Sequence, residues 1–112
     1  MSRGFATPST ESMRHDAGSA EREWETESRY WRAQYLFQPY YEPGRSYDFY
    51  APAYRIAFEA ARAEPGTPFD SLAAGIRSRL ERVKHHADLD WERALPAARA
   101  AWLRAERGRR TH

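Results

Sequence analysis

The residues best suited to chemistry lie in one short stretch, where His85 and His86 are followed by Asp88 and Asp90. Imidazole and carboxylate groups bind zinc, but roughly three or four of them must converge on the ion. Neighbouring residues on a helix do not face each other, so His85 and His86 cannot readily share one ion. The stretch therefore predicts the polar end of a helix, and we expect no metal site.

Other catalytic patterns are also missing. The chain has no cysteine, which excludes thiolate catalysis and disulfides. Gly44, Gly66 and Gly75 are isolated, so no glycine-rich phosphate loop is present, and no serine stands in a nucleophile elbow. We therefore expect a protein that is not an enzyme and that uses no cofactor and no small-molecule substrate. Catalysis by His85 or His86 is the weakest of the hypotheses.

The chemistry that the sequence does offer is aromatic and cationic. All seven tyrosines lie between residues 30 and 54, with arginines interleaved among them. Interfaces between proteins are enriched in Tyr, Trp and Arg, and two adjacent loop tyrosines cannot easily both point inward. The sequence therefore predicts a surface for a protein partner or for self-association, made of Tyr40, Tyr41, Arg45 and Tyr47.

Two other interpretations compete with this one. Bases could stack on the same tyrosines, at about 1–3 kcal/mol per base, while arginines hold the phosphates. This alternative surface for nucleic acid consists of Arg29, Arg32, Arg45 and Arg55. The third interpretation is a core, which the helical spacing of Tyr50, Tyr54 and Phe58 favours.

Composition limits these choices. The chain has 112 residues, which predicts one domain, and its 30% charged residues are ordinary for a folded protein. Seventeen of the 18 basic residues are arginine, a side chain that contacts phosphates, but the 16 acidic residues nearly balance them. We therefore attribute the arginines to a GC-rich genome. With no long apolar run and no secretory signal, we expect no membrane span and a cytoplasmic location.

The spacing of apolar residues predicts an all-α protein, a compact bundle of about four short helices with a disordered N-terminal tail. Residues 1–19 are rich in Ser, Thr, Gly and Pro and predict that tail. The helical domain is expected over 20–107, followed by a basic C-terminal end at 108–112. The first helix is predicted from Ala20 to Phe37, with Ser19 as its N-cap and Trp24, Trp31 and Tyr35 on one face.

A long linker is predicted to follow, over residues 39–51, with a turn at Pro43-Gly44. The second helix is expected to begin near Pro52, because proline suits a first turn. Its predicted buried residues are Tyr54, Ala57, Phe58 and Ala61.

The last two helices have clear start signals. Thr67 and Pro68 predict the start of the third helix, whose buried face is Phe69, Leu72, Ala73, Ile76, Leu80 and Val83. Asp90 is the predicted cap of the fourth helix, in which Pro96 should cause a kink or a short first turn. Its predicted apolar face is Trp91, Leu95, Ala98 and Trp102.

Three segments carry a resemblance: "YWRAQY" at 30–35, "PYYEPGRSYDFYAPAYRIAFEA" at 39–60 and "DLDWERALPAARAAW" at 88–102. Together they resemble a group of small bacterial proteins that is loosely associated with stress-response genes and has no established activity. The resemblance implies a stress-related role and no catalytic residue. With it, we expect a non-enzymatic helical protein that acts through protein contacts, and a nucleic-acid-binding accessory protein is the alternative.

Overall fold

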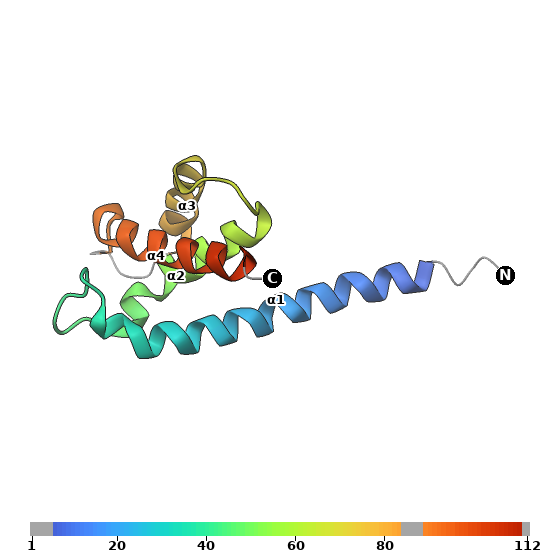
Figure 1. Ribbon diagram of the computed structural model, residues 1–112, viewed down its shortest axis with the longest axis horizontal. Helices are drawn as coiled ribbons and strands as arrows, with labels where there is room; N and C mark the ends of the chain where they lie inside the picture. Colours follow the sequence, from blue (N-terminus) through green and yellow to red (C-terminus); the bar gives the residue numbers. More distant parts are fainter. Residues whose placement is uncertain (1–5, 84–88, 111–112) are drawn as a thin grey trace.

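A computed structural model gives the fold and describes residues 6–83 and 89–110. These residues form four α-helices and one 3-10 turn, without a strand among them (Figure 1). The elements are α1 (Ala6–Gln34), η2 (Tyr35–Phe37), α2 (Tyr47–Ala63), α3 (Phe69–Val83) and α4 (Trp91–Arg110). The predicted all-α bundle is therefore confirmed. None of the described helices has the length and apolar character that crossing a membrane requires.

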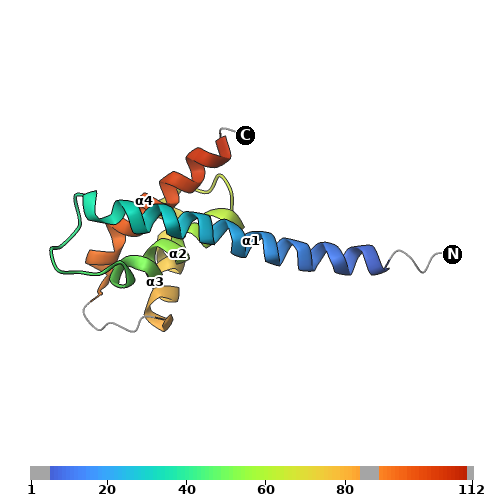
Figure 2. The same ribbon diagram turned by 90° about the horizontal axis from the view of Figure 1, so that it is seen from below.

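Helix α1 starts earlier than the sequence predicts. Its backbone is helical from Ala6 instead of Ala20, so Ser19 lies inside the helix and its hydroxyl donates to Glu23 Oε2 at 3.4 Å instead of capping the first turn. The N-terminal half of α1 extends past the other helices in both views, apart from the compact bundle (Figures 1 and 2). The predicted disorder of residues 1–19 stays a prediction. At the other end, the helix tightens into η2 before Pro39.

Helix α2 is the centre of the bundle, because it packs against α1, α3 and α4, and most extensively against α4. Its predicted buried face is confirmed, and Ala53, Tyr54 and Ala57 have no exposed surface at all. On α4, the residues without exposed surface are also alanines: Ala94, Ala97, Ala98 and Ala101. Small side chains on both helices allow the two axes to lie close together.

This alanine stripe corrects the face predicted for α4. The large side chains Trp91, Leu95 and Trp102 are only partly buried, and they pack at the edges of the core. A hydrophobicity pattern predicts that the largest apolar side chains are the buried ones. Two helices that pack closely instead need small residues at the centre of their contact.

The starts of α2 and α4 differ in how well the sequence predicts them. Asp90 caps α4 as expected, since its Oδ1 accepts the backbone N–H of Arg93 at 3.0 Å. The predicted start of α2 is wrong, because the helix begins at Tyr47 and Pro52 lies inside it. Pro96 likewise lies inside α4. The connection between η2 and α2 is consequently shorter than predicted, residues 38–46, and includes the expected turn at Pro43-Gly44.

Helix α3 presents most of its predicted face to the core. Phe69, Leu72, Ile76 and Leu80 are buried, whereas Val83 at the end of the helix is 47% exposed, contrary to the prediction. His85 and His86 lie outside the described residues. The expected boundary before residue 108 falls inside α4, which continues to Arg110.

Candidate functional site

The tyrosine-rich segment forms the junction between α1, the 38–46 connection and α2. The ring of Tyr54 stacks on Trp31, with centroids 4.5 Å apart and planes 11° apart. Its hydroxyl lies 2.7 Å from the hydroxyl of Tyr40. The Tyr50 hydroxyl accepts the backbone N–H of Glu42 at 2.9 Å and so fixes the connection to α2. Most of the aromatic surface therefore serves packing.

The predicted recognition surface is only partly accessible. Tyr47 is 5% exposed and its hydroxyl lies 2.9 Å from Ser28 Oγ, so its ring is not available to a partner and its place in that surface is wrong. Tyr40 and Tyr41 are partly buried against the core. The Arg45 guanidinium lies 4.3 Å from the centroid of the Phe49 ring that it covers. These residues mainly cover the core, and only part of their side-chain surface is available to a partner.

The arginines of the predicted nucleic-acid surface are brought together in part. Arg29, Arg32 and Arg55 line one open hollow between α1 and α2, and Arg45 lies outside it. Arg55 makes ion pairs with Glu21 at 3.1 Å and with Glu59 at 2.9 Å. These carboxylates offset the positive charge that phosphates would need.

Arginine also covers aromatic rings elsewhere. The guanidinium of Arg32 lies 4.5 Å from the Tyr47 centroid, and that of Arg99 lies 4.8 Å from the Phe69 centroid. Such contacts combine cation–π attraction with burial of a ring face. The arginines are therefore part of the packing at the rim of the core.

Burial decides the acid–base character of the tyrosines. It raises the pKa of Tyr40 to about 12 and also raises the pKa values of Tyr47, Tyr50 and Tyr54. A phenol with a raised pKa stays protonated at neutral pH. These hydroxyls are hydrogen-bonding groups there, and they are not suited to act as bases.

The most exposed apolar side chains near this junction belong to neither predicted surface. Phe37 is 76% exposed and its neighbour Leu36 is 48% exposed, both in the η2 turn. We call these two residues the tip. Among the described aromatic side chains, Phe37 alone is exposed. The sequence contains a signal for this, because Phe37 comes two positions after Tyr35 and so points away from the Trp24–Trp31–Tyr35 face.

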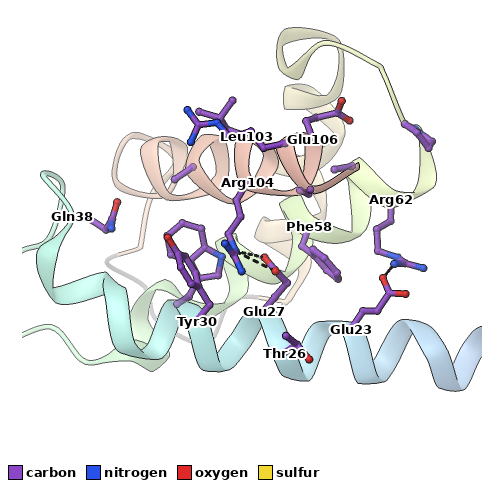
Figure 3. Close-up of a pocket in the computed structure, with 17 residues that line it drawn as sticks. Glu23, Thr26, Glu27, Tyr30, Gln38, Phe58, Arg62, Leu103, Arg104 and Glu106 are labelled. Carbon is purple, nitrogen blue, oxygen red and sulfur yellow. Dashed lines mark hydrogen bonds and ion pairs between the residues drawn. The ribbon is translucent and has the colours of Figure 1, made fainter. Parts of the chain in front are cut away.

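A second feature is a groove of about 970 Å³ between α1 and the C-terminal half of α4, shown in Figure 3. We call it the α1–α4 groove, lined by Glu23, Thr26, Glu27, Tyr30, Trp31 and Gln38, by Phe58, Ala61, Arg62 and Pro65, and by Ala100, Leu103, Arg104, Ala105, Glu106, Arg107 and Gly108. Phe58 points between the two helices, and Arg104 reaches from α4 toward Glu27 on α1 (Figure 3).

Two ion pairs lie in this groove, and one of them joins α4 to α1. Arg104 Nε lies 3.1 Å from Glu27 Oε2, and its guanidinium lies 3.5 Å from the centroid of the Tyr30 ring. Arg62 on α2 pairs with Glu23 on α1. The groove therefore has aromatic and aliphatic walls with both signs of charge on them.

Two buried polar groups belong to the same region. The Glu106 carboxylate is buried and accepts the backbone N–H of Gly66 at 3.2 Å, which ties the α2–α3 turn to α4. The indole N–H of Trp31 is buried without an acceptor among the described residues. An unpaired buried donor costs about 1–3 kcal/mol. The ring itself is well packed, because it stacks on Tyr54 and makes an edge contact with Tyr30 at a centroid distance of 4.9 Å.

Comparisons with known proteins add no identification. No protein-family model matches this sequence, and no curated protein or solved structure is significantly similar to it. The resemblance to small bacterial proteins stays a prediction. Among the described residues, no group of three or more His, Cys, Asp or Glu side chains is placed to hold a metal ion.

Proposed function

We propose that this protein works through protein contacts and associates with a second copy of itself through the tip. The observation that carries the proposal is the exposure of Phe37, 76%, in a protein whose other described aromatic side chains are buried or partly buried. Aromatic anchors of this kind dominate the energy of interfaces between proteins. A link to stress rests on the sequence resemblance alone.

The expected association is weak and concentration-dependent. Burying a phenylalanine fully gains about 1.5–3 kcal/mol relative to leaving it exposed. In a symmetric dimer the same residue contributes twice. Those gains are offset by the loss of translational and rotational freedom, so the tip can support a dimer but not a tight one.

Binding to nucleic acid has less support. Arg55 and Arg45 lie beside glutamates, and phosphates would have to displace those ion pairs. A fluorescence-anisotropy titration with short single-stranded RNA, at low and at moderate salt, tests this alternative. Affinity that falls steeply with salt would favour it over self-association.

Sedimentation velocity over concentrations from about 1 µM to about 1 mM tests the main proposal. We expect the weight-average mass to rise toward the dimer. Phe37→Ser should lower the association constant by at least about 100-fold, since two copies of the ring are lost. Val83→Ser is the matched control, because Val83 is an exposed apolar residue at the end of α3. A wild-type protein that stays monomeric, or equal association of wild type and Phe37→Ser, would refute the proposal.

A further inference from the structure

We infer that the tip of one copy binds in the α1–α4 groove of a second copy, which makes the groove the acceptor for Phe37; this inference rests on the proposed function. The groove offers apolar surface to a phenylalanine ring, because Leu103 on α4 is 40% exposed and Tyr30 on α1 is only partly buried. The buried Phe58 lies between the helices at the base of the groove (Figure 3). Its volume of about 970 Å³ is ample for a single side chain and its neighbours.

The groove is open because its walls are not packed on each other. Helix α1 packs on α2, and α4 also packs on α2, but the described parts of α1 and α4 make no comparable contact. The Arg104–Glu27 pair bridges them instead. A side chain that enters between the helices beside this ion pair does not have to separate a packed apolar interface.

Charge points to a second copy as the occupant. The groove carries two ion pairs, Glu23 with Arg62 and Glu27 with Arg104, and Arg107 also lines it. A polycation would have to draw the two glutamates from their arginines and would be repelled by Arg107, and a polyanion would have to draw Arg62 and Arg104 from their glutamates. A partner with both signs nearly balanced does not, and this chain, at a net charge of +2, is such a partner.

The position of the tip also fits a closed dimer. Gln38 lines the groove and directly follows Phe37 in the chain, so the tip and one end of the groove adjoin. When an inserting element and its acceptor adjoin on one molecule, a twofold axis lets both copies insert at once. The same geometry leaves Phe37 outside its own groove, because the ring is 76% exposed.

Disulfide trapping tests the inference. The chain has no native cysteine, so only the introduced cysteines can form a disulfide. Leu36→Cys keeps Phe37 in place and is mixed, in separate chains, with Thr26→Cys, an exposed residue of the groove. The matched control replaces Thr26→Cys with Glu25→Cys, because Glu25 is exposed on the same helix but lines the hollow that contains Arg55. Heterodimers are quantified on non-reducing gels after mild oxidation.

We expect the Leu36→Cys with Thr26→Cys heterodimer to form at least about 10-fold faster than the Glu25→Cys control, and Phe37→Ser in the Leu36→Cys chain to abolish that difference. Equal rates for Thr26→Cys and Glu25→Cys, or dominant Leu36→Cys homodimers, overturn the groove as acceptor. Sedimentation of the wild type distinguishes failure of this inference from failure of the proposed function. A dimer without preferential trapping refutes only this inference, whereas a strict monomer refutes the proposed function as well.

Discussion

Replacing Tyr40 with phenylalanine removes one half of the hydroxyl pair at the centre of the junction, where the Tyr40 and Tyr54 oxygens lie 2.7 Å apart. Tyr54 has no exposed surface, so Tyr40→Phe leaves its buried hydroxyl without this partner and without access to water. That change should lower the free energy of unfolding by about 1–3 kcal/mol. Tyr54→Phe should cost less, about 0.5–1.5 kcal/mol, because the partly buried Tyr40 hydroxyl can turn toward water.

The double variant decides whether the pair acts as a unit. Once one hydroxyl is gone, removing the other relieves an unpaired group, so the double variant should cost less than the sum of the singles by about 1 kcal/mol. Urea unfolding followed by far-UV circular dichroism at pH 7 gives the three values, with Tyr41→Phe as the control. Additive costs, or a larger cost for Tyr54→Phe than for Tyr40→Phe, would refute the assigned hydrogen bond.

Further predictions concern pH, glycines and the alanine stripe. The pKa of an unfolded phenol is near 10, whereas burial in the folded state raises the pKa of Tyr40 to about 12. The free energy of unfolding should therefore fall as the pH rises from about 10 to about 12, measured by urea titrations at a series of pH values. A flat profile would contradict the burial of this hydroxyl. Gly75 is exposed inside α3 with open space where a methyl group would lie, so Gly75→Ala should raise the free energy of unfolding by about 0.5–1 kcal/mol. Gly44 has a φ of 92°, so Gly44→Ala should lower the free energy of unfolding by about 1–2 kcal/mol. Thermal melting checks both, because the melting temperature should rise for Gly75→Ala and fall for Gly44→Ala. Ala98→Leu should lower the free energy of unfolding by about 1–3 kcal/mol through overpacking against α2, and a neutral result in urea unfolding would argue against close α2–α4 contact.

The all-α fold, the start of α4 and the buried face of α2 could be predicted because local signals agreed with the packing. Asp90 caps α4, and the spacing of Tyr54, Ala57 and Phe58 matches the buried face. The centre of the α2–α4 contact could not be read in the same way, because hydrophobic size alone ranks Trp102 above Ala101. Which of the two lies at the centre depends on the partner helix.

The candidate site was predicted less well, for a related reason. The density of tyrosines indicated a surface, but a tyrosine can bury its ring and still satisfy its hydroxyl, as Tyr47 does with Ser28. For the exposed Phe37 the sequence holds one signal, its position two residues after Tyr35, and this signal indicates exposure only once the end of α1 is known. The groove needed tertiary structure, because its walls are far apart in the sequence.

The arginines that lie over aromatic rings give a different meaning to the near absence of lysine. A planar guanidinium can lie flat on a ring and still turn its N–H groups to a carboxylate, as Arg104 does between Tyr30 and Glu27. An ammonium group is a point charge and cannot cover a ring in that way. The shape of the side chain, and not its charge alone, therefore favours arginine here. In a helical bundle with so many aromatic rings, flat guanidinium groups cover the ring faces at the edge of the core. Exchange of these arginines for lysine would keep the charge but expose those ring faces to water.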